Sequence, residues 1–247
     1  MSETPRRLAF GAHADAYERA RPEWPAAAAR WMVPAGAKLV VELGAGTGKL
    51  TRAVAGLGVD VLAVEPDERM RAVLAGHGLN GVPGSAEEIP AADGEADAIV
   101  AGSALHWFDL ERTLPEIHRV LRPGGRFAFG WNHRDTRIPA VRRMQERMHA
   151  VAAPPGAWWE RDWAAEVVGS GLFGETERAS FEHVLELPRE ALSDLLLSYS
   201  GIARLPEDER NRVFADVAAL VDAEPSLHAG DRLALPFVVD AFRFARV

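Results

Sequence analysis

The feature that most limits how this chain can fold is a glycine-rich turn between a short apolar run and a helical pattern. Residues 39–43 read LVVEL, and the turn GAGTG follows at 44–48. Gly44 permits a tight turn, Gly46 removes the Cβ that would hold a ligand away, and the next helix offers unpaired N–H groups. Glu65 follows 21 residues after Gly44, where a carboxylate can accept hydrogen bonds from both hydroxyls of a ribose. The pattern predicts a nucleoside site.

Short apolar runs alternate with helical patterns from Lys38 to Trp131, which is typical of successive βα units and a parallel sheet. Beyond Asn132 the sequence becomes helix-rich, with one alternating run near 177–187 and a last one at 235–247. Strands are predicted at 39–43, 59–65, 78–84 (a weak pattern), 97–103 and 126–131, and helices at about 47–57, 66–75 and 114–121.

Two amphipathic patterns near 189–222 predict helices that a parallel sheet does not need. Leu192, Leu195, Leu196 and Tyr199 share one helical face, and a second helix begins after Pro206 with three acidic residues. We expect these helices to form a lid over the open end of the sheet; a dimer interface is the alternative for the same apolar faces. No internal repeat or low-complexity linker divides residues 1–247, so we expect a single domain.

Three nucleoside-type ligands compete for the glycine turn. A P-loop for ATP or GTP needs glycine where Leu43 stands and a hydroxyl side chain where Leu50 stands. A dinucleotide fingerprint needs a third small residue at the position of Lys49. The spacing therefore excludes the P-loop and makes dinucleotide binding a poor second choice.

The remaining pattern resembles the class I S-adenosylmethionine-dependent methyltransferases. Glu42 and the turn at 44–48 are similar to the first motif of that family, and Val64-Glu65-Pro66-Asp67 is similar to its second-strand acid. The segments 84–90, 97–100 and 119–125 then resemble its adenine loop, its fourth strand and its turn into the fifth strand. The resemblance covers about residues 38–131 and implies a Rossmann-like α/β fold: a mostly parallel sheet whose last strand is antiparallel, here with helical lid insertions.

Within that family the chain looks most like the small-molecule branch that contains the trans-aconitate and the ubiquinone/menaquinone-biosynthesis methyltransferases. The resemblance implies an N-terminal segment (1–35) that closes over the cofactor, a cofactor-binding core (36–135) and a C-terminal part (136–247) that carries the lid helices. It implies S-adenosyl-L-methionine as cofactor, with contacts from Tyr17, Arg21, Glu42, Gly44, Ala45, Gly46, Glu65, Pro66, Met70, Ser85, Ala86, Glu87 and Ser103.

The need for a general base depends on the acceptor, since a carboxylate needs none whereas a phenol or alcohol does. His106 is the first candidate for a base, because it lies just past the end of a parallel strand, and His133 is the second. A wall position in the cofactor pocket is the alternative for His106. We expect acceptor contacts from Trp107, Trp131, Asn132 and Tyr199.

Composition limits the partners. The 28 basic and 36 acidic residues give a net charge of −8, which disfavours nucleic acid as a partner. The chain has no cysteine, and its Glu146–His149 spacing has no companion pair, so no metal is expected. No apolar run reaches the ~18 residues of a membrane span, and no signal sequence is recognisable, so we expect a cytoplasmic protein, a monomer or homodimer, with a small-molecule substrate.

The sequence thus predicts S-adenosylmethionine-dependent methyl transfer to a small molecule, with oxygen as the favoured acceptor atom. Two alternatives stay open at this point. One is a protein that binds the cofactor without methyl transfer, and the other is an enzyme that uses the same pocket for a non-methylating reaction such as a cyclisation.

Overall fold

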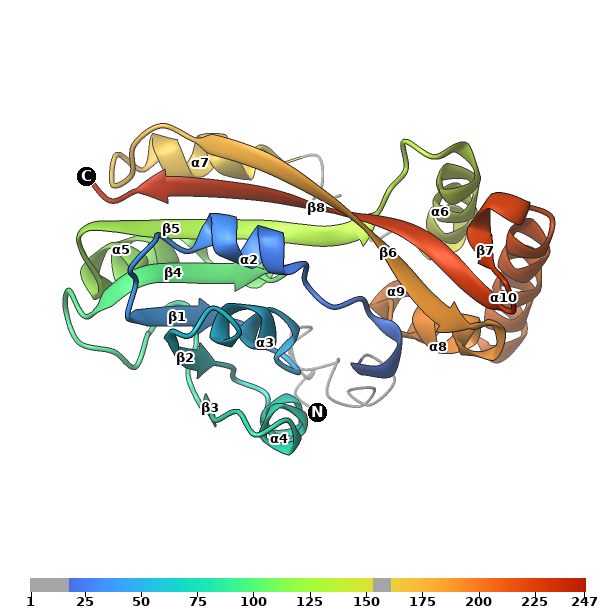
Figure 1. Cartoon of the computed structure of the whole chain (residues 1–247), viewed down its shortest axis with the longest axis horizontal. Helices are drawn as coiled ribbons and strands as arrows, with labels where there is room; N and C mark the ends of the chain where they lie inside the picture. Colours follow the sequence, from blue (N-terminus) through green and yellow to red (C-terminus); the bar gives the residue numbers. More distant parts are fainter. Residues whose placement is uncertain (1–17, 153–160) are drawn as a thin grey trace.

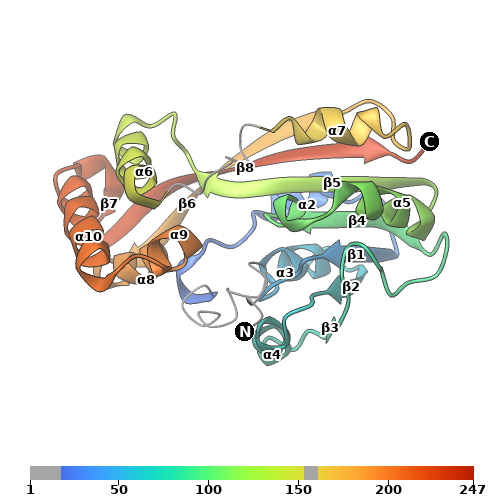
Figure 2. The same cartoon turned by 180° about the vertical axis from the view of Figure 1, so that it is seen from behind.

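A computed structural model describes residues 18–152 and 161–247. One twisted sheet runs through this part of the chain, with helices on both faces (Figures 1 and 2). The strands are β1 (Leu39–Leu43), β2 (Asp60–Val64), β3 (Gly81–Val82), β4 (Ala96–Gly102), β5 (Leu121–Arg134), β6 (Glu177–Pro188), β7 (His228–Ala229) and β8 (Arg232–Ala245). The α-helices are α2 (Ala26–Met32), α3 (Lys49–Ala55), α4 (Glu68–Gly76), α5 (Leu110–Val120), α6 (Pro139–Ala152), α7 (Trp163–Gly169), α8 (Leu192–Leu197), α9 (Ser200–Ala203) and α10 (Glu207–Asp222).

The strand order is β3-β2-β1-β4-β5-β8-β6, with β7 beside β8. Strands β1 to β5 pair in parallel, whereas β8 is antiparallel to both β5 and β6. The order reverses between β1 and β4, so the chain leaves the carboxyl ends of these two neighbouring strands toward opposite halves of the sheet, and a crevice forms there. The predicted mostly parallel sheet with an antiparallel last strand is confirmed.

The central strands β1 and β4 are buried on both faces, which explains why they are almost wholly apolar. Alternate residues of β1 point to opposite faces: Val40 belongs to the apolar cluster that includes α2 and α3, whereas Val41 and Leu43 belong to the cluster that includes α5. Figure 1 shows α2 and α3 in front of the sheet, and Figure 2 shows α5 in front on the other side. Residues 26–33 therefore belong to the core of the fold, and only residues 18–25 of the described N-terminal segment lie nearer the crevice.

The last helix of the βα series differs from its predicted bounds of 114–121. Helix α5 begins four residues earlier, at Leu110, and continues through Pro115. A proline inside a helix removes one backbone hydrogen bond. Leu110 and Leu114 are buried against the sheet, and this apolar burial offsets the lost hydrogen bond.

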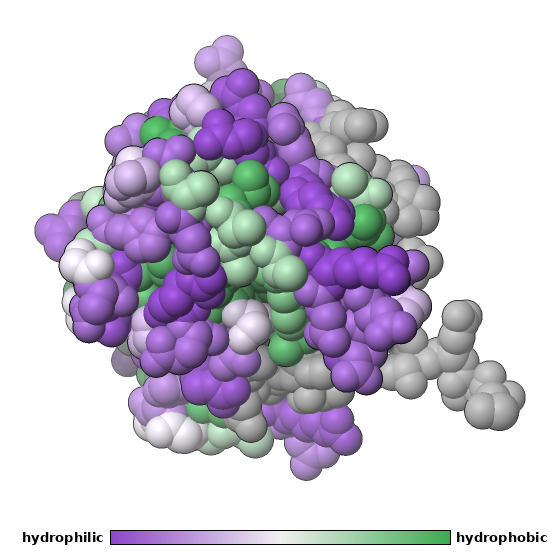
Figure 3. Space-filling view, turned by 90° about the vertical axis from the view of Figure 1, so that its right-hand side faces the viewer, coloured by the Kyte–Doolittle hydropathy of each residue, from purple (hydrophilic) through white to green (hydrophobic). Residues whose placement is uncertain are grey.

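The long strands β5, β6 and β8 extend beyond the parallel sheet and carry a second layer of helices at one end (Figure 1). The apolar faces of α6, α8 and α10 pack there against Leu233, Leu235 and Phe237 of β8. The surface at this end is mainly hydrophilic, with a small apolar area in its middle (Figure 3). The apolar faces that suggested a dimer interface are thus largely buried within the chain.

Candidate functional site

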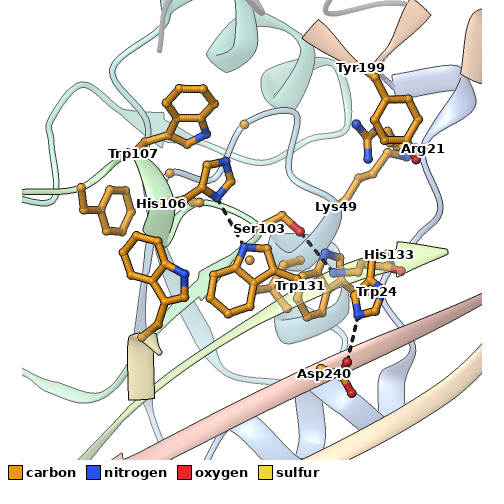
Figure 4. Close-up of a pocket in the computed structure, with 18 of the residues that line it drawn as sticks. Arg21, Trp24, Lys49, Ser103, His106, Trp107, Trp131, His133, Tyr199 and Asp240 are labelled. Carbon is orange, nitrogen blue, oxygen red and sulfur yellow. Dashed lines mark hydrogen bonds and ion pairs between the residues drawn. The ribbon is translucent and has the colours of Figure 1, made fainter. Parts of the chain in front are cut away.

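A pocket of about 1070 Å³ opens at the carboxyl ends of β1, β2, β4 and β5. Its walls come from the glycine turn, the ends of these strands, residues 21–24, and helices α6 and α9. Figure 4 shows His106, Trp107 and Trp131 at one side of the pocket and Arg21 and Tyr199 at the other, with Ser103 between them. This is the place where open α/β sheets bind ligands.

The glycine turn has the backbone that the sequence predicted. Gly44, Gly46 and Gly48 have φ values of +68°, +58° and +90°, in the left-handed region that favours glycine. A Cβ at Gly44 would lie 2.8 Å from the Cβ of Ala104, whereas a Cβ at Gly46 would meet nothing within 4 Å. Gly44 is therefore required by the protein's own packing, and Gly46 keeps open a space that a ligand can fill.

Glu65 is held rigidly at the edge of this turn. Its Oε2 accepts a hydrogen bond from Gly46 N (2.8 Å), and its Oε1 accepts one from Asp67 N (2.9 Å). Burial raises the pKa of Glu65, and these two backbone hydrogen bonds oppose that effect. A carboxylate offers about four lone-pair sites, so each oxygen can still accept one hydrogen bond from a ligand.

Glu42 lies deeper, at the base of the pocket. Thr51 Oγ1 donates a hydrogen bond to its Oε2 (2.6 Å), and the side chain is completely buried. Burial, together with the negative charge of Glu65, raises the pKa of Glu42 to about 8 although the Thr51 hydrogen bond acts in the other direction. Glu42 therefore keeps a proton at neutral pH and can donate a hydrogen bond.

This shift predicts a pH-dependent stability. The unfolded chain loses the Glu42 proton near pH 4.5, while the folded chain keeps it until about pH 8. The folded state then binds more protons, so this residue lowers the free energy of unfolding as the pH rises through that window. We expect Glu42→Gln to become progressively more stable relative to the wild type across the window in urea denaturation. Exposed Glu68, replaced by Gln, is the matched control, and parallel wild-type and Glu42→Gln profiles would contradict the assignment.

The remaining predicted cofactor residues of the core line the same pocket. Pro66, Met70, Ser85, Ala86 and Glu87 all contribute to its wall. Met70 and Ala86 are buried, and the Oε1 of Glu87 accepts a hydrogen bond from Asp109 N (3.0 Å). Ala45 also lies in the wall. The structure thus brings together the predicted set from Glu42 to Glu87.

Ser103 has a strained backbone. Its φ of +54° makes it the single non-glycine residue with positive φ in the described part of the chain. Its N–H donates to the carbonyl of Gly130 (2.7 Å), and its Oγ accepts from the N–H of Asn132 (3.2 Å). A serine in this conformation costs about 1–2 kcal/mol, and such strain concentrates at functional sites. Ser103 lines the pocket, and its contact with the cofactor stays a prediction.

The N-terminal segment reaches the pocket through Arg21, whereas Tyr17 lies outside the described residues. Arg21 Nε donates to Ser198 Oγ (2.9 Å) and its Nη2 to the Ser198 carbonyl (3.2 Å). Lys49, which disfavoured a dinucleotide, is buried, and its Nζ forms an ion pair with Glu23 (2.9 Å). The lysine therefore fastens the N-terminal segment to the glycine turn, a role that the sequence reasoning missed.

His106 is partly buried, and its environment keeps it neutral. Burial and the nearby positive charge of Arg21 lower the pKa of His106 to about 4. Trp131 Nε1 donates a hydrogen bond to His106 Nδ1 (3.4 Å; Figure 4). A neutral imidazole whose Nδ1 accepts must carry its proton on Nε2, which can then donate but not accept.

His133 is tied to the sheet. Its Nε2 lies 2.9 Å from Asp240 Oδ2, and its Nδ1 lies 3.1 Å from the carbonyl oxygen of Arg134 (Figure 4). Ser180 Oγ also donates to Asp240 (2.5 Å). Both ring nitrogens face oxygen atoms of the protein, and a neutral ring can donate to one of them. The contact with Asp240 connects β5 to β8.

The four predicted acceptor residues all line the pocket. The amide of Asn132 is engaged at both ends, because Nδ2 donates to the Glu23 carbonyl (3.0 Å) and Oδ1 lies 2.9 Å from His183 Nε2. Tyr199 was expected on the same helical face as Leu192, but α8 ends at Leu197. Tyr199 instead precedes α9, and Arg21 lies over its ring with Cζ 3.7 Å from the ring centroid.

Arg134 is a further pocket residue that the sequence reasoning did not single out. It ends β5, three residues beyond the predicted strand end at 131, and is only 4 % exposed. Its position next to His133, at the carboxyl end of a predicted parallel strand, is the sequence feature that could have identified Arg134 as a pocket residue. Its burial, however, depends on residues that lie far away in the chain.

Comparisons with known proteins agree with this site. Residues 41–129 match the family of methyltransferase domains. A methyltransferase from Mycobacterium tuberculosis is 39% identical over 96% of this chain and 95% of its own length. The ubiquinone/menaquinone biosynthesis C-methyltransferase of Rubrivivax gelatinosus is 34% identical over 42% of this chain and 43% of its own.

The fold has a solved counterpart in Anaeromyxobacter dehalogenans. That protein, assigned as a type II methyltransferase, has a TM-score of 0.67 and 25% identity, and the match covers 92% of this chain and 97% of the other. No helix in residues 18–152 or 161–247 is both long enough and apolar enough to cross a membrane. The glycine turn, the carboxylate of Glu65 and the full-length relationship lead to one conclusion: the chain belongs to the S-adenosylmethionine-dependent methyltransferases.

Proposed function

We propose that the protein transfers a methyl group from S-adenosylmethionine to an oxygen of a small molecule, and that this oxygen is already ionised at neutral pH, as in a carboxylate. The proposal rests on the hydrogen-bond contacts of the two predicted bases, His106 and His133. Nδ1 of His106 accepts a hydrogen bond from Trp131, and both nitrogens of His133 face oxygen atoms of the protein, so neither ring presents an unoccupied acceptor nitrogen in an obvious place for a base. An ionised oxygen has no proton to lose and needs neither of them.

The residues of the pocket would then act by positioning. S-adenosylmethionine, when bound, supplies a methyl group on a positively charged sulfur. Glu65 would hold the ribose hydroxyls, and the backbone at Gly44 and Gly46 would hold the amino-acid part. Trp107 and Trp131 would form apolar walls that orient the acceptor and exclude water, which is the main catalytic contribution available here. The pocket of about 1070 Å³ exceeds the usual size for one ligand, which favours a small acceptor bound beside the cofactor.

We also propose that residues 18–25 and the segment from α8 to α9 close the pocket as one unit. Two contacts already join them, since Arg21 binds Ser198 and Arg19 Nη2 lies 3.3 Å from Asp194 Oδ2. Helix α10 does not line the pocket and packs against α6, so it supports this unit from behind.

Amide hydrogen exchange should reveal this closure. On addition of cofactor, we expect protection to rise together around residues 18–21 and 192–199, because each segment forms one wall of the chamber. Strand β1 is already buried and should change little. Protection of 192–199 that followed protein concentration and ignored the cofactor would instead support a dimer interface.

The experiment that tests the proposed function is incubation with methyl-labelled cofactor and a metabolite extract, followed by base hydrolysis of the labelled product. We expect a labelled ester, which mild base cleaves. A base-stable ether would contradict the ionised oxygen, and a label on carbon or nitrogen would contradict oxygen altogether. Cofactor binding without any labelled product would favour the non-transferring alternative, and its conversion to a different product would favour the non-methylating one.

A further inference from the structure

Arg134 is a buried cation that the described residues leave without an anion. Its Nε donates to Gln145 Oε1 (3.0 Å), but its Nη1 is buried and has no hydrogen-bond partner. In the described part of the chain no carboxylate forms an ion pair with it, and burial, together with the charge of Arg21, lowers its pKa. Leaving a buried charge unpaired is among the most costly arrangements in a protein.

The surroundings of Arg134 hold the guanidinium in place rather than neutralise it. Gln145 fixes its Nε edge, and its Cζ lies over the ring of Tyr199 at 4.3 Å from the ring centroid. Arg21 lies over the same ring. His149 follows Gln145 by one helical turn, and its pKa is lowered by burial and by the charge of Arg134, so it adds no negative charge.

From this we infer that Arg134 binds an oxyanion of the acceptor, a carboxylate or a phosphate group, at the Tyr199 side of the pocket. Arginine suits this task because its planar fork of donors matches the oxygens of such groups. Arg21 adds a second positive charge beside the same ring. The inference names the substrate class for the proposed function and rests on it.

This oxyanion would anchor the acceptor and would be distinct from the oxygen that receives the methyl group. Asn132 on β5 is level with Ser103, because its N–H bonds to Ser103 Oγ. Arg134 lies two residues further along the strand, about 7 Å at the usual rise per residue. An oxyanion paired with arginine is also a poor nucleophile, whereas a remote charged anchor can orient the acceptor without taking part in the reaction.

The first test uses Arg134→Met and, as a matched control, Arg204→Met. Arg204 lines the same pocket but is exposed. Thermal unfolding of each protein, saturated with S-adenosylhomocysteine, is followed in sodium acetate and in sodium phosphate against sodium chloride of equal ionic strength. For each protein we measure the rise in Tm relative to chloride. We expect at least one oxyanion to give a rise that is about 2–4 °C larger in the wild type and in Arg204→Met than in Arg134→Met. General salt effects cancel in this comparison.

The two salts identify the source of the charge, since a response to acetate alone indicates a carboxylate and a response to phosphate alone indicates a phosphate group. The inference would be overturned if the oxyanion salts raised the Tm of all three proteins equally. It would also be overturned if both variants lost the same part of this rise in Tm. In chloride we expect Arg134→Met to be at least as stable as the wild type, because an uncompensated charge has been removed. A purely structural arginine would give a less stable variant.

The second test needs only the wild type, so it can be carried out even if Arg134→Met does not fold. The labelled methyl product should keep the anchoring oxyanion and should therefore be retained on an anion exchanger at neutral pH. A neutral labelled product would overturn the inference. An anionic product methylated on carbon would overturn the proposed oxygen acceptor and leave the anchoring role of Arg134 standing, so the two failures are distinguishable.

Discussion

Replacing Glu65 by alanine should weaken the binding of S-adenosylmethionine and of S-adenosylhomocysteine by about 2–4 kcal/mol, or roughly 30- to 1000-fold. In the proposed complex, the substitution would remove charge-assisted hydrogen bonds to the two ribose hydroxyls. It also removes the acceptor for Gly46 N and Asp67 N, which hold the turn and the start of α4 in place. Glu65→Gln should lose less, because the amide oxygen still accepts one hydrogen bond. Isothermal titration calorimetry measures both variants.

Glu68→Ala is the control for this experiment, because it removes the same charge three residues away from an exposed site in α4. Its affinity should match that of the wild type. Unchanged affinity in a folded Glu65→Ala protein would show that the carboxylate does not contact the ribose. An equal loss in both variants would point to the general charge of the region instead.

The parallel half of the sheet could be predicted from the sequence because its signals are local. The strand LVVEL, the glycine turn and the acid at 65 all lie within one βαβ unit, whose two strands read as mainly apolar runs. The first two predicted strands agree with β1 and β2 to within a residue. The weak pattern at 78–84 became the two-residue strand β3.

The end of β5 could not be predicted because distant residues hold it. Asn132, His133 and Arg134 are polar and look like a loop, yet they pair with Val239, Val238 and Phe237 of β8, more than a hundred residues away. The same holds for Tyr199. A helical pattern runs through it, but the helix stops at Leu197, and Arg21 binds the hydroxyl and the carbonyl of Ser198 from the other end of the chain.

The candidate cofactor residues of the core were therefore easier to place in one pocket from the sequence than the candidate acceptor residues. The former lie on one contiguous unit whose geometry the glycine turn sets. The latter are assembled from β5, α6 and the region between α8 and α9, three segments that only the tertiary structure brings together. Arg134 illustrates this, since its partners Gln145 and Tyr199 come from two of these segments.

Replacing Gly46 by alanine separates the needs of the ligand from the needs of the fold. Gly46 and Gly58 both have positive φ, at +58° and +78°, and a Cβ on either would meet nothing within 4 Å. Alanine should therefore cost each site a similar backbone strain, about 1–2 kcal/mol. Gly46 lines the pocket, whereas Gly58 follows α3 on the exposed surface.

We expect Gly46→Ala to weaken cofactor binding by about 1–3 kcal/mol, or about 5- to 150-fold, because the added methyl occupies space that the ligand needs. Gly58→Ala should lose similar stability in urea denaturation and keep the wild-type affinity. Equal affinities for the two variants would place the cofactor away from Gly46, and a much larger stability loss at Gly46 would show that the fold itself requires that glycine.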